Sequence, residues 1–506
     1  MIEVERKFVV DADFVLPPLP EVPGWPTGWS VADGGVVLLE ATYYDTADLR
    51  LARARITLRR RTGGKDAGWH LKIQDGKERE EIHAPLGSAK ETVPRALSDL
   101  VLVHSRHEPL GPVAKITTER HVRNVCNAAG EVLVELAEDL VRAHALGRGE
   151  PDAGAAASWR EIEAELMPAG GDDDLTVVVG LLDAAGAQRA PFPSKLTRAL
   201  GEAAMAPPEV VEPATVVKPE EPARDAVTAY LRTQTRALMA QDPRVRRDQY
   251  DSVHRMRVAA RRLRSALRTF RPLLDSQRAD ALEPELRWLG TVLGDPRDRE
   301  VLHARLQEEF DSLPPDAVLG SVAEVFDKEM LGGLRRAQEQ ARAQLRNKRY
   351  LDLVDLLVAF AADPPVTDKA ERPAATVLPR LVAKAWRRLD RAVRAAQASQ
   401  RDEDWHEARK AGKRARYAAE AVEVVHGGDA ADLAAQAEAV QEVLGEHQDS
   451  VVAREVLRRL AAAHNDAGFT LGVLYGVERE RGRASLRAFD GVWATASRKR
   501  HRRWLR

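Results

Sequence analysis

The chain has 506 residues, of which 77 are lysine or arginine and 78 are aspartate or glutamate, and its formal net charge is −1. Its length predicts two or three domains, and a hydrophobic content of 44% is high enough to exclude an intrinsically disordered protein. The single cysteine, Cys126, excludes an intrachain disulfide, and no CxxC motif or Cys/His cluster indicates a zinc site.

The first ten residues, MIEVERKFVV, predict a β-strand with one charged face. Side chains alternate between the two faces of a strand, so Glu3, Glu5 and Lys7 share a face that is largely opposite the apolar residues. A solvated strand gives this pattern by chance, and so does a site for a metal ion and an anion. This strand alone leaves both interpretations open.

Similar short strands follow through the first 200 residues. Their sequences are VVLLEATYYDT, RITLRRR, WHLKIQ, REEIHAPL, EVLVELAED and WREIEAEL. Several have an apolar face and a charged face: Arg59 and Arg61 share one face of their strand, and Glu161, Glu163 and Glu165 share one face of theirs. A sheet with one solvated side explains any single strand, but charged faces of nearly pure acid or pure base on several strands indicate a common site.

The chemistry of that site follows if the sheet closes into a barrel. The charged faces then line the interior, where a charge must be paired or hold a ligand. Carboxylates bind hard divalent cations such as Mg²⁺ or Mn²⁺ through oxygen, and arginine and lysine bind phosphate oxygens. A metal together with phosphate predicts phosphoryl-transfer chemistry.

Residues 206–223 are rich in proline, glutamate and valine and predict an extended linker, although an ordered connection packed on one domain has the same composition. From residue 224 the apolar residues recur every three to four positions, which predicts an all-helical domain. We expect the prolines to divide it into several helices. These prolines stand at positions 272, 284, 314, 315, 364 and 365.

The helical part contains an internal repeat with an offset of 152 residues. His254 aligns with His406, and the residues that follow align as Arg257/Arg409, Arg261/Lys413, Arg262/Arg414 and Arg264/Arg416. A second matched block, VLGDPRDREVL and VLGEHQDSVVA, pairs Asp298 with Asp449. Two matched blocks in the same order predict two related helical bundles.

Each repeat places basic residues along one helix face. Like charges at this spacing repel, so the stripes require an anion or acidic partners on neighbouring helices. The second alternative, a solvated and internally paired face, stays open, and each histidine alone could be structural. The candidate anion-binding residues are His254, Arg257, Arg261, Arg262, Arg264, His406, Arg409, Lys410, Lys413, Arg414 and Arg416.

The first part of the chain resembles the CYTH domains, the triphosphate tunnel metalloenzymes. EVERK matches the family's Glu-x-Glu-x-Lys signature, and YYDTADLRL, LRRR, EVLVELAED, WREIEAEL and PSKLTRAL resemble its later motifs in the right order. The resemblance implies an eight-stranded antiparallel tunnel barrel over residues 1–203, which hydrolyses triphosphate compounds with a divalent metal.

The resemblance also implies roles for individual residues. It assigns catalysis to Glu3, Glu5 and Lys7. The implied metal ligands are Glu3, Glu5, Glu135, Glu163 and Glu165. The implied phosphate-binding residues are Lys7, Arg59, Arg61, Lys72, Arg120 and Lys195. Lys115 competes with Arg120 because the two lie on opposite faces of a regular strand, Glu161 is either a ligand or a rim residue, and Arg60 should point away from the site.

Residues 224–506 resemble the CHAD domain, a conserved-histidine α-helical domain often found behind a CYTH domain, with 204–223 as the linker. This resemblance implies two four-helix bundles with a basic groove that binds inorganic polyphosphate. A nucleic acid is a less favoured partner, because few aromatic residues, Tyr417 and Phe270 among them, lie near the stripes.

Together these observations predict an α+β two-domain protein that hydrolyses inorganic triphosphate or short polyphosphate and binds polyphosphate. Two alternatives stay open: hydrolysis or cyclisation of an organic triphosphate such as thiamine triphosphate or ATP, and a non-catalytic polyphosphate-binding scaffold. No apolar run is long enough to span a membrane and no signal-peptide pattern starts the chain, so we expect a cytoplasmic protein, with polyphosphate granules as a further expected location.

Overall fold

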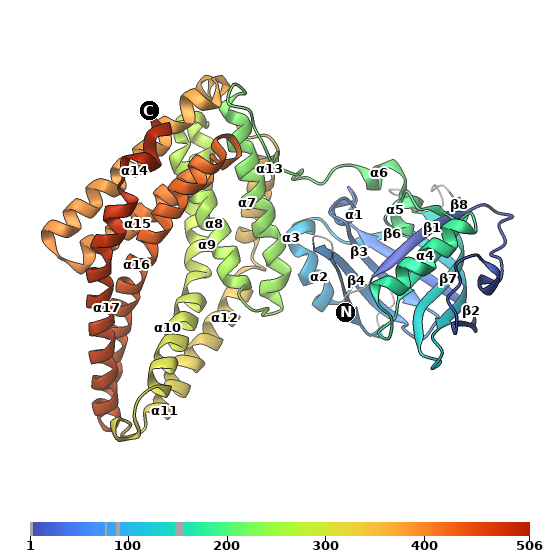
Figure 1. Cartoon of the computed structure of the whole chain (residues 1–506), viewed down its shortest axis with the longest axis horizontal. Coiled ribbons are helices and arrows are strands. Elements are labelled where there is room, and N and C mark those ends of the chain that lie inside the picture. Colours follow the sequence, from blue (N-terminus) through green and yellow to red (C-terminus); the bar gives the residue numbers. More distant parts are fainter. Residues whose placement is uncertain (1–3, 76–77, 88–91, 147–155) are drawn as a thin grey trace. The chain divides into compact units, whose positions relative to one another are not determined.

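A computed structural model describes residues 4–75, 78–87, 92–146 and 156–506. The chain divides into two compact units, Met1–Glu209 and Val210–Arg506 (Figure 1). The first contains an antiparallel sheet with short helices and the second is helical, so the predicted α+β class is confirmed. None of the helices in the described parts is long and apolar enough to cross a bilayer.

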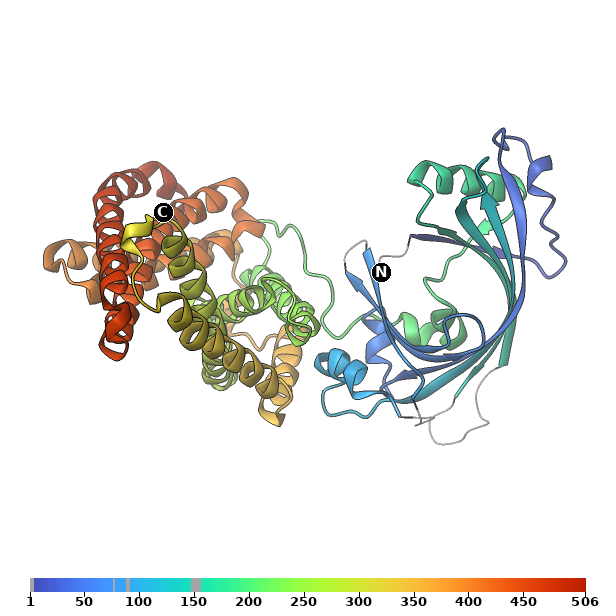
Figure 2. The same ribbon diagram turned by 90° about the horizontal axis from the view of Figure 1, so that it is seen from below.

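The sheet of the first unit is a single antiparallel sheet in the order β5-β4-β3-β2-β6-β7-β8-β1-β9. The strands are β1 Glu5–Val10, β2 Ser30–Asp45, β3 Ile56–Thr62, β4 Gly68–Asp75, β5 Glu78–Ala84, β6 Gly111–Cys126, β7 Val132–Ala145, β8 Ala156–Leu166 and β9 Gln188–Arg189. The sheet is strongly curled (Figure 2). Eight strands were predicted; the ninth, β9, adds two residues beside β1.

Hydrophobic packing lies on the outer face of the curled sheet. Helix α4, Asp172–Ala184, packs there with Val178 against Phe8 of β1 and Ile162 of β8. The short helices α1 Arg50–Arg53, α2 Arg95–Ser98 and α3 Leu102–Ser105 cover β3 and β4 around Trp69, which is fully buried. One face of each strand takes part in this packing, so the opposite face, which carries the charged residues, points to the inner side of the curled sheet.

The second unit consists of helices (Figure 1). Its longer helices are α7 Ala223–Arg246, α8 Ser252–Thr269, α9 Ser276–Val292, α10 Gly294–Asp311, α12 Gly332–Gln344, α13 Lys348–Ala362, α14 Ala374–Ser399, α15 Asp402–Glu420, α16 Glu423–Ala463 and α17 Gly468–Ala496. Helices α7, α8, α9 and α13 pack as one bundle and α14–α17 as a second, and the bundles meet where α8 contacts α15. Beyond that contact, Leu306 of α10 packs with Leu457 of α16 and Leu474 of α17.

One predicted helix break is wrong. Pro284 lies inside α9 and does not divide it. A proline removes one backbone hydrogen bond of a helix, and Pro284 is exposed, so water can solvate the carbonyl that loses its donor. The other predicted prolines lie outside the long helices: Pro272 follows α8, Pro314 and Pro315 follow α10, and Pro364 and Pro365 follow α13.

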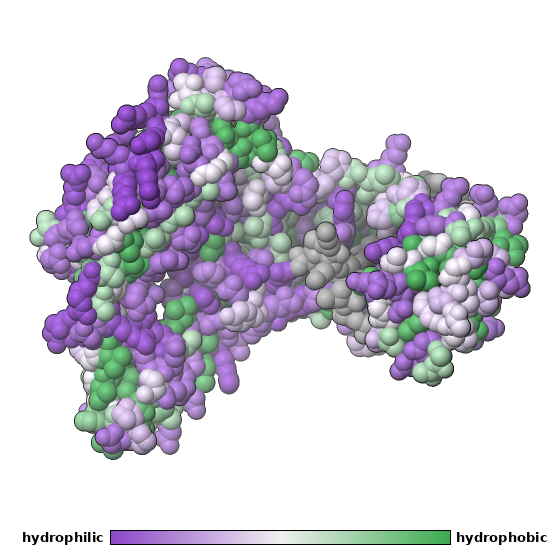
Figure 3. Space-filling view, in the orientation of Figure 1, coloured by the Kyte–Doolittle hydropathy of each residue, from purple (hydrophilic) through white to green (hydrophobic). Residues whose placement is uncertain are grey.

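The segment between the sheet and the helices is partly ordered against its neighbours. Short helices α5 Lys195–Leu200 and α6 Glu202–Met205 end the first unit, and Arg53 donates to the Pro207 carbonyl at 2.9 Å. In the second unit Val210 and Val217 are buried, and the Val217 amide donates to the Val424 carbonyl. Hydrophilic side chains cover much of the surface in view in each unit (Figure 3).

Candidate functional site

The curled sheet encloses a cavity of about 800 Å³, which is lined by the inward faces of β1 to β8 and by the start of α5. It brings together ten of the residues that the sequence nominated. They are Glu5, Lys7, Arg59, Arg61, Lys72, Arg120, Glu135, Glu163, Glu165 and Lys195. Glu3, a nominated catalytic residue and metal ligand, lies outside the described residues. Because side chains alternate along each strand, charged residues from separate sequence motifs point into the same cavity.

Three carboxylates form a row across neighbouring strands. In the strand register Glu5 of β1 lies beside Glu165 of β8, and Glu165 lies beside Glu135 of β7. All three line the cavity, and the Lys7 ammonium lies 3.4 Å from a Glu5 oxygen. Adjacent like charges on a sheet are unfavourable, and hard divalent cations prefer carboxylate oxygen. The chemistry of this donor set fits Mg²⁺ or Mn²⁺, and the three carboxylates would have to move closer together to hold the ion, because their oxygens do not all lie within 4.8 Å of one another.

Glu163 is the centre of a second acidic group, which is already neutralised by cations. Its carboxylate accepts from Lys7, from Arg120 at 2.5 Å and from Lys195 at 2.7 Å. Burial alone would raise the pKa of Glu163, but Lys195, Lys7 and Arg120 outweigh it and hold the pKa well below the usual value. For Lys7, the carboxylates of Glu163 and Glu5 outweigh burial and raise the pKa. Both groups therefore stay charged at neutral pH.

The network continues one step further along the strands. Asp139 accepts two hydrogen bonds from Arg120, at 2.8 and 2.7 Å, and its carboxylate lies 2.9 Å from the Lys195 ammonium. Glu161 accepts from the Trp159 indole at 2.5 Å and pairs with Lys195 at 2.7 Å. The oxygens of Asp139, Glu161 and Glu163 lie close enough to hold a metal, but Arg120 and Lys195 already occupy them. These contacts hold the cations in fixed positions.

The arginines of β3 add further positive charge to the cavity lining. Burial, followed by repulsion from Arg59 and Arg120, lowers the pKa of Arg61 to about 10. Arg59 donates to the Tyr43 hydroxyl at 3.4 Å, and its field, with those of Lys195 and Lys7, lowers the pKa of Tyr43 although burial would raise it. Such mutual repulsion indicates a wall that is stabilised when a polyanion binds.

The strand alternation separates the ambiguous candidates. Arg120 lines the cavity, whereas Lys115 on the opposite face of β6 is exposed, and Arg60 is absent from the cavity lining. Glu161 is buried among Lys195 and Trp159, so it supports the cations and does not line the cavity.

Sequence reasoning missed several participants. Asp139 lies four residues after Glu135 on the same face of β7, so the two-residue period could have found it. Tyr43 lay inside a quoted motif but carried no charge to attract notice. His70 shares the face of Lys72, but only the strand register reveals its neighbours Glu81 and His83.

A different arrangement of charges occurs in the second unit, where α8 contacts α15. Arg257 of α8 pairs with Asp298 of α10 at 2.7 Å, and Arg409 of α15 pairs with Asp449 of α16 at 3.5 Å. The guanidinium of Arg257 lies 3.6 Å from the position that a side chain at Gly294 would occupy, and that of Arg409 lies 3.4 Å from the same position at Gly445. The predicted repeat is thus present in side-chain contacts as well as in sequence.

Four cations meet at this place, and we call Arg257, Arg261, Arg409 and Lys413 the basic cluster. Burial, followed by repulsion from Arg409, Arg261 and Arg257, lowers the pKa of Lys413 to about 7. Among the described residues no carboxylate lies within ion-pair distance of Lys413, and the buried Nε atoms of Arg261 and Arg409 have no hydrogen-bond partner. Within the basic cluster Arg257 and Arg409 thus keep a carboxylate partner, whereas Lys413 lacks the anionic partners that the cavity provides for Lys195.

The remaining basic candidates lie around the cluster in different environments. His254 and His406 flank it, and burial followed by neighbouring cations lowers the pKa of each, so both are neutral at pH 7. Arg262 and Arg416 both bind Glu420, at 2.9 and 2.6 Å, and lie over the Tyr417 ring.

The other basic candidates are Lys410, Arg264 and Arg414. Lys410 is exposed and pairs with Glu407 at 2.7 Å. Burial and then neighbouring arginines lower the pKa of Arg264 and of Arg414, which lie near Arg268. The nominated residues thus divide into a four-cation cluster without acidic compensation for Lys413 and a periphery that is partly paired.

Comparison with known proteins identifies both units. The CYTH domain family model matches residues 1–200 and the CHAD domain family model matches residues 229–458. An uncharacterized protein of Mycobacterium tuberculosis, found in strains H37Rv and CDC 1551, is 38% identical over 97% of this chain and 96% of its own length. The chain belongs to the CYTH–CHAD family. Its CYTH domain is thus of the triphosphate tunnel metalloenzyme superfamily, whose members act on triphosphates with a divalent metal.

Similar solved structures cover parts of the chain. PptA from Streptomyces chartreusis has a TM-score of 0.46 and 23% identity, covering 54% of this chain and 99% of that protein. The CHAD domain from the plant Ricinus communis has a TM-score of 0.46 and 25% identity, covering 56% and 94%. A putative adenylate cyclase from Bacillus halodurans has a TM-score of 0.25 and 18% identity, covering 40% and 98%.

Proposed function

We propose that the CYTH domain hydrolyses inorganic triphosphate or a related short polyphosphate with Mg²⁺ or Mn²⁺, and that the CHAD domain binds polyphosphate. The observation that carries the first part is that one cavity contains both carboxylates and cations. The row of carboxylates Glu5, Glu165 and Glu135 shares a volume of about 800 Å³ with a set of arginines and lysines.

The residues of the cavity supply what phosphoryl transfer requires. Arg59, Arg61, Arg120, Lys7 and Lys195 would hold the phosphate oxygens and orient the chain of phosphoryl groups. Since carboxylates already fix Lys7, Arg120 and Lys195, these cations need little reorganisation when charge builds up on the substrate. Glu5, Glu135 and Glu165 would hold the divalent metal, which when bound neutralises charge on the phosphate oxygens.

An inorganic substrate fits the lining better than a nucleotide does. Besides the imidazole of His83, the described lining offers one aromatic side chain, Tyr43, and it is buried and held close to Arg59. A nucleobase would therefore meet charged groups and small aliphatic side chains such as Val37 and Leu39 instead of a stacking surface.

The decisive experiment measures phosphate release by the full chain from inorganic triphosphate, ATP and long-chain polyphosphate, with Mg²⁺ or Mn²⁺. We expect release from triphosphate that a chelator abolishes, and a loss of roughly 100-fold or more in Glu5→Gln, as expected when one group that stabilises transferring phosphate is removed. Glu119→Gln, an exposed carboxylate on the outer face of β6, is the matched control. Equal rates in Glu5→Gln and wild type would contradict the proposal.

The same experiment distinguishes the alternatives. A cyclic product from ATP would identify a cyclase, and preferential release from ATP would identify an organic triphosphatase. Absence of release from every substrate, with metal binding intact, would leave a polyphosphate-binding scaffold.

Polyphosphate binding by the CHAD domain is supported by the basic cluster. Four cations lie together while the aromatic residues near them, Tyr417 and Phe270, are buried, so neither offers a surface for base stacking. Binding of a polyphosphate would be multidentate and sensitive to salt, because each phosphate replaces screening ions around an arginine or lysine. A filter-binding or calorimetric titration of the full chain with long-chain polyphosphate at two salt concentrations tests this. Equal affinity for single-stranded DNA of the same charge would favour nucleic acid instead.

A further inference from the structure

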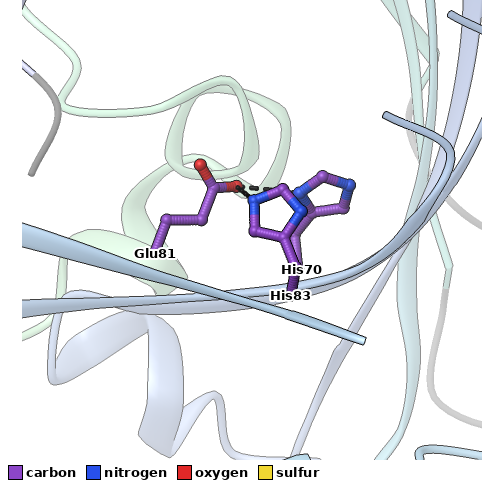
Figure 4. A group of neighbouring side chains, drawn as sticks. All are labelled: His70, Glu81 and His83. Atoms are coloured by element: carbon purple, nitrogen blue, oxygen red, sulfur yellow. Dashed lines mark hydrogen bonds and ion pairs between the residues drawn. The ribbon is translucent and has the colours of Figure 1, made fainter. Parts of the chain in front are cut away.

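A second group of polar side chains lies on the β4–β5 hairpin, at a distance along the sheet from the carboxylate row. The strand register places His70 beside His83 and Lys72 beside Glu81, and the alternation puts all four on the same face. Figure 4 shows the imidazoles of His70 and His83 converging on the Glu81 carboxylate. Glu81 and His83 line the cavity, whereas the His70 side chain is completely buried.

The buried imidazole of His70 faces hydrogen-bond acceptors on both sides. Its Nε2 atom lies 3.0 Å from the Asp66 carbonyl oxygen, and its Nδ1 atom lies 2.8 Å from Oε1 of Glu81. A carbonyl only accepts, so Nε2 carries the proton, and a neutral ring then presents the Nδ1 lone pair to a carboxylate oxygen. Two electron-rich atoms at this distance repel unless a proton or a metal ion lies between them.

A second proton on this ring is disfavoured by its surroundings. Burial lowers the pKa of His70, and the positive charges of Arg59 and Arg61 lower it further, against the opposing effect of Glu81. A neutral imidazole whose other nitrogen is fixed by a backbone carbonyl is the usual form of a metal-binding histidine.

We propose that Nδ1 of His70, Oε1 of Glu81 and Nε2 of His83 form a binding site for a borderline transition-metal cation, Zn²⁺ foremost. The three ligand atoms lie within 4.8 Å of one another, and Nε2 of His83 is 3.5 Å from the shared Glu81 oxygen. Ligands at 2.0–2.2 Å from a tetrahedral zinc are about 3.3 Å apart. The distances from Glu81 Oε1 to His70 Nδ1 and to His83 Nε2, 2.8 and 3.5 Å, each lie within about half an ångström of that spacing.

The surroundings supply the support that such a site needs. The Asp66 carbonyl orients His70, and the Lys72 ammonium lies 3.3 Å from the second oxygen of Glu81. His83 is half-exposed and lines the cavity with Glu81, so a fourth position faces the interior and is open to water or to a phosphate oxygen. Two nitrogens and one oxygen favour Zn²⁺ over Mg²⁺, which prefers oxygen ligands only.

This site is separate from the carboxylate row and does not depend on the proposed hydrolysis. His70 and His83 are 13 positions apart in the chain, and only the hairpin register brings them together.

The test is a calorimetric titration of the full chain with Zn²⁺ in excess Mg²⁺, which occupies sites made of oxygen ligands alone. We expect one equivalent of Zn²⁺, and an affinity at least tenfold lower in His83→Ala and in Glu81→Gln, a loss within the range for removing groups that hold or orient a metal. The control is His121→Ala, since His121 pairs with Asp33 at 2.9 Å on the opposite face of its strand from the cavity-lining Arg120.

A second readout keeps the test independent of folding. Co²⁺ in place of Zn²⁺ should give visible absorption bands typical of nitrogen-containing coordination, absent in His83→Ala and unchanged in His121→Ala. Because His83 is half-exposed, its substitution leaves the core intact, which circular dichroism will verify. Equal Zn²⁺ affinity in His83→Ala and His121→Ala, or no Zn²⁺ binding by the wild-type chain, would overturn the proposal.

Discussion

Two partly buried lysines show how the two domains differ in the environment of a positive charge. Lys195 in the CYTH cavity lies 2.7 Å from Glu161, 2.7 Å from Glu163 and 2.9 Å from Asp139, and these carboxylates outweigh burial and raise its pKa. Lys413 in the CHAD domain is surrounded by arginines, and burial with their repulsion lowers its pKa to about 7. The same side chain is thus stabilised as a cation in one domain and destabilised in the other.

The difference separates a network of paired charges, for which we propose a catalytic role, from a cluster that contains a repelled cation, for which we propose anion binding. In the cavity the ion pairs fix the cations before any substrate arrives, as preorganised catalysis requires. In the basic cluster Arg257 and Arg409 are paired but Lys413 is not, so the folded state carries repulsion on Lys413 that a polyanion would relieve.

Removing the two ammonium groups should change stability in opposite directions. Lys195→Met leaves Asp139, Glu161 and Glu163 without one of their cations and should lower the free energy of unfolding by about 3–5 kcal/mol, as when one partner of a buried ion pair is lost. Lys413→Met removes a repelled cation and should raise it by about 1 kcal/mol. Denaturant unfolding at pH 7, followed by circular dichroism, measures both.

The effect of Lys413→Met on the free energy of unfolding also depends on pH. Its pKa is lower in the folded chain than in the unfolded chain, so the unfolded chain binds more protons between pH 7 and pH 10.5 and the wild type gains stability as pH rises. The advantage of Lys413→Met should therefore be larger at pH 6 than at pH 9. A destabilised Lys413→Met at pH 6 would contradict the contrast drawn above.

Two adjacent arginines should differ strongly in their effect on hydrolysis. Arg59 lines the cavity and Arg60 does not. Arg59→Ala should lower kcat/KM for inorganic triphosphate by about 10²–10³-fold, the cost of losing one positioned charge at a reacting phosphate, whereas Arg60→Ala should change it less than about twofold. Steady-state phosphate release compares them, and similar losses in both variants would show that the strand alternation does not define the site.

The duplicated arginines of the CHAD domain should govern binding alone. The double variant Arg257→Ala/Arg409→Ala should weaken polyphosphate binding by roughly 10- to 100-fold and reduce its salt dependence, because two phosphate contacts are lost. Triphosphate hydrolysis in the CYTH domain should be unchanged. The matched control is Arg299→Ala/Arg401→Ala, in which both arginines are well exposed and paired with a nearby carboxylate. If the control variant bound polyphosphate as weakly as the double variant, binding would depend on the overall positive charge of the domain and not on Arg257 and Arg409.

The smallest effect is a pH dependence of polyphosphate binding. A polyanion favours the ammonium form of Lys413, so binding should take up a proton above pH 7 and affinity should fall as pH rises from 6 to 8, by at most about tenfold per pH unit for one proton. Calorimetry in two buffers of different ionisation enthalpy measures the uptake. In Lys413→Arg the side chain stays charged, so the proton uptake due to Lys413 should be lost. Any proton uptake due to the neighbouring His254 and His406 should remain.

Local patterns predicted much of this molecule because they need only neighbouring residues. Period-two alternation placed Arg59, Arg61, Glu163 and Glu165 toward the interior, and the repeat identified Arg257 and Arg409 as equivalent. The same period extends from Glu135 to Asp139 and was not followed far enough. Pro284 was misjudged because a proline on the exposed side of a helix costs less than its usual effect as a helix breaker.

What sequence could not provide is the register between distant strands. Lys7 pairs with Glu163 across 156 positions. His70 meets Glu81 and His83 only through the register of the hairpin, and a register shifted by two or four residues would give the same alternation of faces. The partners that raise or lower each pKa depend on those pairings, so the contrast between Lys195 and Lys413 is a property of the folded chain.

The duplicated contacts of the CHAD domain carry a further consequence. Arg257 with Asp298 and Gly294, and Arg409 with Asp449 and Gly445, are two copies of one arrangement that meet at α8 and α15. A linear polyphosphate reads the same from either end, unlike a nucleic acid or a peptide, which has a direction. If the CHAD domain binds polyphosphate as proposed, its two equivalent halves would accept such a chain in either orientation without any added contact.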